Sequence, residues 1–300
     1  MVYKPFSSFC FRFPLLSYNH LEDSVHYDFF TDYLNQEKWQ EAIYLGSPVL
    51  YQELSKLSKD FDSEQKQNRQ ILYSLNRYIN RMTTRCTPFG LFAGCGIGKT
   101  GEHTAILLND KMDRTSRLDM FYLCALYDAL LKIPEIKQHI TYYPNTTLYS
   151  SGEKYRYVEW KYFGTRRRYE LTEVDRSIYL NKMLKKAVNG ARSDELINTL
   201  ISPQISHEVA EEFINELIDS QLLIGELCQA ITGEDFFIRL LKLIEPHESK
   251  IQISNPLKTI KSSLEELDKG NSGIEVYEKI ISFVKEIEVP YEENICFKLI

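Results

Sequence analysis

The chain has 300 residues, enough for one large or two modest domains, and its 43% hydrophobic content is sufficient for a packed core. This composition excludes a disordered or collagen-like protein. The 36 Lys and Arg residues are outnumbered by 42 Asp and Glu residues, which gives a net charge of −6. An overall basic coat for nucleic acid is therefore excluded, and any site for a polyanion must be a local patch.

The distribution of cysteines and apolar residues bears on the cellular compartment. The six cysteines include no Cys-x-x-Cys pair, and the first residues contain no apolar export signal. We therefore expect reduced thiols and a cytoplasmic protein. No apolar run approaches the roughly 18 residues that a membrane span needs. The six histidines lack ligand spacing, so we expect no metal site.

Residues 1–140 are predicted to form an α+β domain. Apolar and polar residues alternate after residue 10, which predicts a strand over 10–18. Ser47 and Pro48 are typical of a helix start, and a longer helix is expected from residue 62 or 63 to near Arg85, before a type I turn at 87–90. Further elements are a short strand at 104–108 and a helix at 118–131.

Residues 141–224 are predicted to form a winged-helix-like module, in which three antiparallel strands precede three helices. The expected strands are 141–150, 154–163 and 166–173, and the expected helices are 175–188, 193–201 and 206–220. Gly190 is predicted to stop the first helix, while Ser193 and Ser206 are predicted to cap the other two.

Residues 225–300 are predicted to be a helical segment that ends in a strand. The expected helices are 233–245, 256–268 and 274–287, and the strand is 295–300. A chain that stops inside a strand predicts truncation, with the pairing partner of that strand beyond residue 300. The predicted fold class is thus α+β, with an embedded winged-helix-like peptide-recognition module.

Glycines at 94, 96, 98 and 101 suggest a nucleotide-binding loop, but the spacing argues against one. Only three residues separate Gly94 from the Gly-Lys-Thr at 98–100, whereas a phosphate loop needs four. The G-x-G-x-x-G pattern at 96–101 is followed by a strand pattern and not by a helix. We interpret these glycines as positions where a strand bends or a backbone approaches closely.

Arg77, Arg81 and Arg85 are four residues apart on one predicted helix, so their guanidinium groups share a face. Between Lys66 and Arg117, nine Lys or Arg residues stand against three acids, a local charge of +6 in an acidic chain. This contrast favours a polyanion site over a merely solvated helix face. The three arginines at 166–168 are interpreted as an exposed hairpin tip, with phosphate binding as the alternative.

Residues 81–94, RMTTRCTPFGLFAG, resemble the signature of lantibiotic dehydratases. Supporting matches that extend the resemblance over residues 10–245 are RFPLL at 12–16, RLD at 117–119, NTTLY at 145–149 and TGED at 232–235. In that family the N-terminal part transfers glutamate from glutamyl-tRNA to Ser or Thr of a ribosomal precursor peptide. A separate C-terminal part then eliminates the glutamate.

The resemblance also implies roles for individual residues. The residues implied in catalysis are Arg81, Arg85, Thr87 and Asp119, and those implied in tRNA binding are Arg12, Arg77, Arg81 and Arg85. We expect Arg81 and Arg85 to point into one cleft near Arg12 and Thr87. Without the resemblance, Asp119 is simply an acid at a helix start. Glutamyl-tRNA would be a co-substrate, and no other cofactor is expected.

The resemblance further implies that 141–224 binds the leader region of the precursor, which would add a strand to a sheet edge. Val209, Phe213 and Leu217 are the predicted peptide-binding residues. A further expected partner is a separate protein that carries out elimination or cyclisation. Since no elimination domain is found in these 300 residues, we expect no dehydration by this chain alone. The alternative function is that of a non-catalytic leader-peptide recognition protein.

Overall fold

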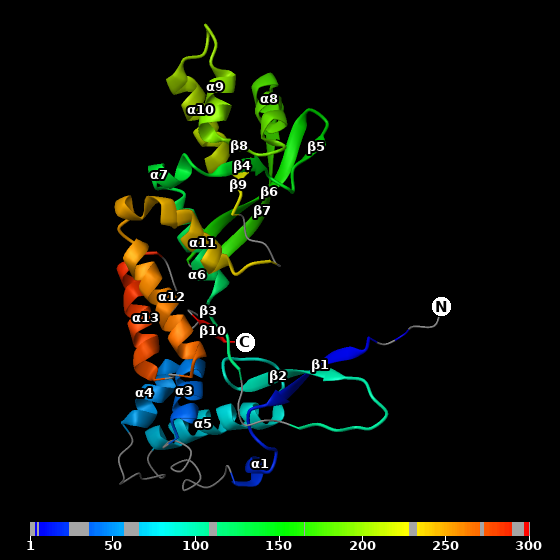
Figure 1. Ribbon diagram of the computed structural model, residues 1–300, viewed down its shortest axis with the longest axis vertical. Helices are drawn as coiled ribbons and strands as arrows, with labels where there is room; N and C mark the ends of the chain where they lie inside the picture. Colours follow the sequence, from blue (N-terminus) through cyan, green and yellow to red (C-terminus); the bar gives the residue numbers. More distant parts are fainter. Residues whose placement is uncertain are drawn as a thin grey trace. The chain divides into compact units, whose positions relative to one another are not determined.

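The computed structural model describes residues 4, 6–23, 36–56, 66–107, 113–164, 166–227, 233–270, 273–289 and 297–299. The chain forms two compact units. The first unit comprises Met1–Asp119, Thr259–Phe283 and Glu293–Ile300, and the second comprises Met120–Lys258 and Val284–Glu292. Helices and strands are mixed in both, which confirms the α+β class (Figure 1).

The helices of the first unit are α1 (His20–Asp23), α3 (Glu37–Gly46), α4 (Pro48–Ser55) and α5 (Lys66–Thr84), with most of α12 (Ser254–Asp268) and α13 (Ile274–Glu286). Buried side chains of α3, α4 and α5 form one apolar core together with Leu16 and Phe92. The predicted apolar stripe of α5 is confirmed, because Ile71, Leu75, Ile79 and Met82 are buried. Ser47 caps α4 as predicted, since its hydroxyl accepts from the N–H of Leu50 at 3.2 Å.

The long helix ends where Pro88 predicts, but the following turn lies later in the chain than expected. α5 stops at Thr84, and residues 57–65, where its start was predicted, lie outside the described residues. The N–H of Phe92 donates to the carbonyl oxygen of Phe89 at 3.0 Å, and Gly90 has a φ of +53°. The turn therefore spans 89–92, with Gly90 as its second residue, because glycine adopts a positive φ without strain.

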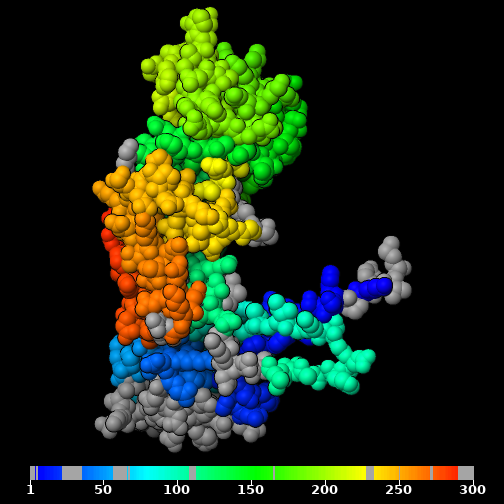
Figure 2. All heavy atoms as spheres, viewed as in Figure 1, coloured from blue at the N-terminus to red at the C-terminus, as the bar shows by residue number. Residues whose placement is uncertain are grey.

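Strands β1 (Ser8–Pro14) and β2 (Ala93–Lys99) form an antiparallel ribbon (Figure 1), in which Phe11 lies opposite Gly96. In Figure 2 the atoms of these two segments, blue and blue-green, lie side by side. The glycine-rich segment is therefore itself a strand. The predicted strand at 104–108 is wrong, because 104–107 are not in a strand, and residue 108 lies outside the described residues.

The glycines of β2 give room to the aromatic rings of β1. A Cβ atom added at any of three glycines would lie 2.5–2.7 Å from a ring carbon of the phenylalanine opposite. The pairs are Gly94 with Phe13, Gly96 with Phe11 and Gly98 with Phe9. A close approach is thus found at these three glycines, but it is made by aromatic side chains and not by a backbone, and Gly101 has no such neighbour.

The last strand has its partner within the chain. β10 (Phe297–Leu299) pairs antiparallel with β3 (Ser116–Leu118), so that Phe297 lies opposite Leu118. The strand thus has a partner within the 300 residues, which the sequence analysis did not foresee. Local sequence cannot reveal this pairing, because β3 is only three residues long and about 180 residues away.

A buried ion pair connects distant segments of the first unit. Arg114 donates to both carboxylate oxygens of Glu41, at 2.7 and 3.2 Å, and the hydroxyl of Tyr277 donates to the same carboxylate at 2.6 Å. Glu41 is 3% exposed and Tyr277 is fully buried. Burial and the nearby carboxylate raise the pKa of Tyr277, so its hydroxyl stays a donor.

The second unit contains two small antiparallel sheets. One has the order β8–β4–β9 and the other β5–β6–β7. Their strands are β4 (Thr141–Pro144), β5 (Tyr149–Ser151), β6 (Lys154–Phe163), β7 (Arg166–Asp175), β8 (Ala191–Arg192) and β9 (Leu223–Gly225). The predicted strand 141–150 is thus two strands in different sheets. Asn145 separates them, because its side-chain oxygen accepts from the N–H of Thr147 and forms a turn.

The helices of the second unit agree closely with the predicted ones, except that the short helix over residues 134–137 was not predicted. They are α6 (Met120–Leu130), α7 (Pro134–Lys137), α8 (Ile178–Ala187), α9 (Ser193–Leu200), α10 (His207–Asp219) and α11 (Phe236–Ile244). Gly190, with a φ of +86°, follows the end of α8, and Ser206 caps α10. The cap of α9 is Arg192 and not Ser193, because the carboxylate of Glu195 accepts from the N–H of Arg192.

The buried ion pair yields a stability prediction. We expect Glu41→Gln to lower the free energy of unfolding by about 3 kcal/mol, because it leaves the Arg114 charge without its counter-ion in a largely buried place. Tyr277→Phe removes one hydroxyl only and should cost about 1 kcal/mol. Urea unfolding at constant m-value measures both. Equal losses in the two variants would contradict the dominance of the charge pair.

Candidate functional site

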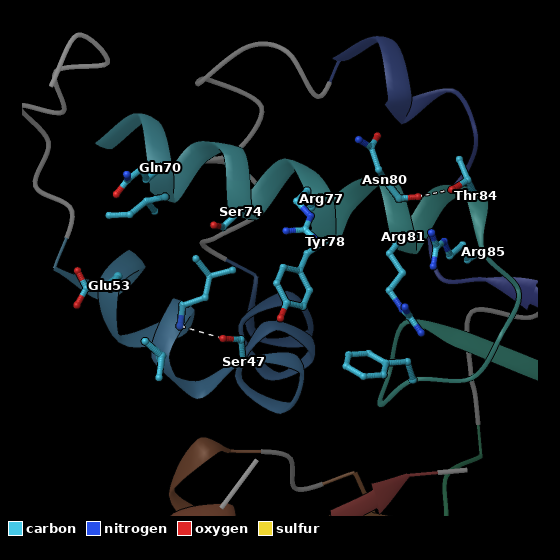
Figure 3. Close-up of a pocket in the computed structure, with 14 residues that line it drawn as sticks. Ser47, Glu53, Gln70, Ser74, Arg77, Tyr78, Asn80, Arg81, Thr84 and Arg85 are labelled. Carbon is cyan, nitrogen blue, oxygen red and sulfur yellow. Dashed lines mark hydrogen bonds between the residues drawn. The ribbon is translucent and has the colours of Figure 1, made fainter. Parts of the chain in front are cut away.

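A cleft of about 830 Å³ lies along α5 in the first unit, with α4 and the turn residue Phe89 on its other sides (Figure 3). The residues of α5 and its end that line it are Gln70, Ile71, Ser74, Arg77, Tyr78, Asn80, Arg81, Thr84 and Arg85. All three arginines that the sequence singles out are therefore brought to one cleft.

The charge of the cleft follows from the composition of α5. This 19-residue helix contains no acidic residue. Like charges four residues apart cost about 0.2–0.5 kcal/mol per pair, and none of the three arginines forms an ion pair with a described residue. Glu53, the acid that lines the cleft, pairs with Lys56 at 2.9 Å. A bound anion would relieve the repulsion among the arginines.

Arg81 is held in place by an aromatic ring. Its guanidinium carbon lies 4.3 Å from the centre of the Phe89 ring, and Figure 3 shows the side chain extending from α5 on the same side as Tyr78. Its Nε is shielded from solvent and has no hydrogen-bond partner among the described residues. Tyr78 in turn donates to the carbonyl of Gly46 at 3.2 Å. These contacts give Arg81 and Tyr78 defined positions in the cleft.

The other predicted site residues are not among those that line the cleft. Arg12 is exposed on β1, opposite Cys95. Thr87 is exposed just after α5, and Asp119 is 5% exposed between β3 and α6. The structure therefore groups Arg77, Arg81 and Arg85, but it does not add Arg12, Thr87 or Asp119 to them.

Arg114 and Arg167, which the sequence analysis treats as surface cations, are instead shielded from solvent and form ion pairs. Arg114 belongs to the local +6 patch by sequence, but it is paired with Glu41. Burial lowers the pKa of Arg114, and the hydrogen bond to Glu41 together with the charges around it more than offsets this. Arg167 is 3% exposed at its side chain and donates to Asp128 at 2.6 Å while stacking on Trp160. Strand alternation explains why Arg167 and its exposed neighbours differ, since they lie on opposite faces of β7.

The second unit offers a long open strand edge. In the sheet β5–β6–β7, β7 has 10 residues and pairs on one side only, among the strands that the structure describes. Tyr169 and Leu171, two residues apart on one face of β7, are each 63% exposed. An exposed edge with apolar side chains is suited to pairing with another strand.

The opposite edge of the sheet is closed by side chains beyond β5. The hydroxyl of Thr147 accepts from the N–H of Val158 at 2.9 Å, and the amide of Asn145 donates to the carbonyl of Val158 at 3.1 Å. Gln221 binds both the N–H and the carbonyl of Trp160, each at 2.9 Å. Gln221 has a φ of +59°, a strained conformation that sequence reasoning had no means of detecting.

The three predicted peptide-binding residues of α10 differ in exposure. Leu217 is 5% exposed and belongs to the core face of the helix with Ala210 and Ile214, while Val209 is exposed and Phe213 is half-buried. A hollow of about 500 Å³ in this unit is lined by Ile218 and Asp219 at the end of α10, and not by these three residues.

In the described ranges, no group of three or more His, Cys, Asp or Glu residues is placed to hold a metal ion. None of the helices within those ranges has both the length and the apolar character that crossing a membrane requires.

The family model for "Lantibiotic dehydratase, N terminus" matches residues 35–298. The epidermin biosynthesis protein EpiB of Staphylococcus epidermidis is 25% identical over 278 residues, which are 85% of this chain and 27% of EpiB. The subtilin biosynthesis protein SpaB of Bacillus subtilis is 23% identical, over 91% of this chain and 26% of SpaB. The chain thus spans about a quarter of the length of these relatives.

Solved structures share the fold. The tRNA dependent lantibiotic dehydratase MibB from Microbispora sp. 107891 has a TM-score of 0.76 at 19% identity, covering 98% of this chain and 28% of MibB. The glutamylation domain of TbtB, from thiomuracin biosynthesis, has a TM-score of 0.56 at 16% identity, covering 84% of this chain and 30% of the TbtB chain.

The Gln221 contacts predict an unusual order of stabilities. Gln221→Ala loses two hydrogen bonds and keeps the strained backbone, so we expect the free energy of unfolding to fall by about 2 kcal/mol. Gln221→Gly loses the same bonds but removes the strain, so its loss should be smaller by about 1 kcal/mol. Urea unfolding compares the two variants, and an alanine variant as stable as the glycine variant would contradict this account.

Proposed function

The chain belongs to the lantibiotic dehydratase family and matches the N-terminal region of those proteins. We therefore propose that it takes part in transferring glutamate from glutamyl-tRNA to a ribosomal precursor peptide. The acceptors are the hydroxyl groups of Ser and Thr in that peptide. The descriptions of MibB as tRNA dependent and of TbtB as a glutamylation domain support this reaction. Elimination of the glutamate is assigned to another part of the enzyme, or to a separate elimination or cyclase protein.

The observation that carries the proposal is the cleft of Arg77, Arg81 and Arg85. The chain as a whole carries −6, so it repels a polyanion except where cations are concentrated. Arginines bind phosphate oxygens in a planar, two-pronged geometry, and several on one face can hold successive phosphates. We assign the cleft to the acceptor end of the tRNA, with Arg12 as a further contact implied by the family resemblance.

The chemistry required is acyl transfer. The Ser or Thr oxygen attacks the ester carbonyl that joins glutamate to the tRNA, and the ester bond to the ribose breaks. The proton of the attacking hydroxyl ends on the ribose oxygen that leaves, so no oxidant or cofactor is needed. Negative charge develops on the carbonyl oxygen, and a preorganised cation such as Arg81 would stabilise it. The catalytic roles of Thr87 and Asp119 rest on the resemblance alone.

We assign recognition of the leader peptide to 141–224, as a winged-helix-like module. The leader would pair with the open edge of β7 and place apolar side chains over Tyr169 and Leu171. Val209 and Phe213 are further candidates for contact. A non-catalytic leader-recognition protein is the second candidate function, favoured by an open edge in a unit that lacks the arginine cleft.

Loss of the cleft arginines should separate catalysis from recognition. In cells that contain the precursor and the other biosynthetic proteins, we expect Arg81→Ala or Arg85→Ala to reduce glutamylation at least about 100-fold, because each removes a cation from the transfer site. Leader affinity should stay unchanged. Mass spectrometry of the precursor measures the adducts, with Lys38→Ala, an exposed cation of α3, as the control. Undiminished glutamate adducts in either variant would refute the assignment.

The β7 edge can be tested without disturbing the sheet. Val158 and Trp160 use their backbone groups on the far side of β6, so the residues opposite them, Leu171 and Tyr169, direct their own backbone groups toward the open edge. Leu171→Pro therefore removes an outward N–H and spares the β6–β7 bonds. We expect it to weaken binding of a labelled leader about tenfold or more.

Leu171→Ala is the matched control for that variant, because it keeps the N–H and loses only the side chain. It should bind the leader better than Leu171→Pro does. Titration of the 300-residue chain, without tRNA, gives both affinities. Equal affinity of the proline variant and the unmodified chain would show that the leader does not use this edge.

A further inference from the structure

We infer that the RNA-binding surface continues along α5 beyond the arginine cleft, to a second hollow formed by Lys66, Arg69 and Tyr73. This inference rests on the proposed function, because it takes the tRNA as the ligand of the cleft. It adds two cations and one aromatic residue that neither the sequence motif nor the family resemblance singles out.

The second hollow has a volume of about 460 Å³ and adjoins the cleft. It is lined by Lys66, Arg69, Gln70, Tyr73 and Ser74, and two of these, Gln70 and Ser74, also line the cleft. The two hollows are therefore consecutive along one helix. At 1.5 Å per residue, the path from Lys66 to Arg85 is about 28 Å long, which is enough for several nucleotides of an RNA strand.

All charged side chains of α5 along this path are positive. Lys66 and Arg69 are exposed, and the helix has no acidic side chain to neutralise them. Neither forms an ion pair with a described residue. The charged side chains of this helix are all cations, and they repel one another unless an anion lies beside them. The backbone of the tRNA supplies such an anion at regular intervals.

Tyr73 distinguishes an RNA surface from a general anion site. The residue is 68% exposed, so one face of its ring is open to a ligand. An exposed ring between cations is the arrangement by which proteins hold single-stranded nucleic acid, with a base stacked on the ring and phosphates on the cations. An acidic peptide would use the cations but would have little need of the ring.

The test measures binding of deacylated glutamate tRNA to the chain, by fluorescence anisotropy at several salt concentrations. For Lys66→Ala/Arg69→Ala we expect the slope of log affinity against log salt to become shallower by about 1.4–1.8, the value for two lost phosphate contacts. Tyr73→Ala should weaken binding about fivefold or more, and Tyr73→Phe should restore it, because stacking needs only the ring. Lys38→Ala should leave the slope unchanged.

Arg77→Ala in the cleft separates failure of this inference from failure of the proposed function. If Arg77→Ala weakens tRNA binding and the double variant keeps the original slope, the extended surface is refuted and the cleft stands. If the unmodified chain binds no tRNA, both proposals fail. If the double variant loses affinity only for an acidic peptide such as polyglutamate, the surface is a peptide site and the inference is overturned.

Discussion

The Glu41–Arg114 ion pair is the constraint on which the first unit depends. Each charge is stable in the interior only because the other is there, so α3, the segment before β3 and α13 must come together as a set. The N–H of Ser116 then donates to Asp268 of α12 at 2.6 Å, which fixes β3 where β10 can pair with it. Since α3 also packs on α4, the same network supports a wall of the arginine cleft.

Features that depend on neighbours in sequence were predictable, and those that depend on distant partners were not. The apolar spacing of α5 and the cap at Ser47 follow from residues within one or two turns of helix. The pairing of β10 with β3 and the hydrogen bond between Glu41 and Tyr277, which are 236 residues apart, cannot be predicted from the local sequence. The glycines of β2 have a meaning only once the phenylalanines of β1 lie opposite them, which is why a strand was expected ten residues too late.

The features of the candidate site also fall into those that local sequence predicts and those that depend on distant partners. Four-residue spacing on a helix is enough to bring Arg77, Arg81 and Arg85 to one face, so their grouping could be predicted. The ring of Phe89 that contacts Arg81 depends on a turn whose place could be predicted only approximately. The strained backbone of Gln221 could not be predicted at all, because glutamine has no preference for a positive φ, and the contact with Trp160 spans 61 residues.

The glycine and phenylalanine pairs of the β1–β2 ribbon restrict how this part of the chain can evolve. A methyl group at Gly96 would meet the ring of Phe11, so neither position can be enlarged alone, and loss of the ring would bare the glycine backbone of the neighbouring strand. Acceptable change must therefore be compensatory, with a larger residue on one strand accompanied by a smaller one directly opposite. Across homologues, the three pairs should covary as couples, with the ribbon's thickness conserved and not the identity of any single residue.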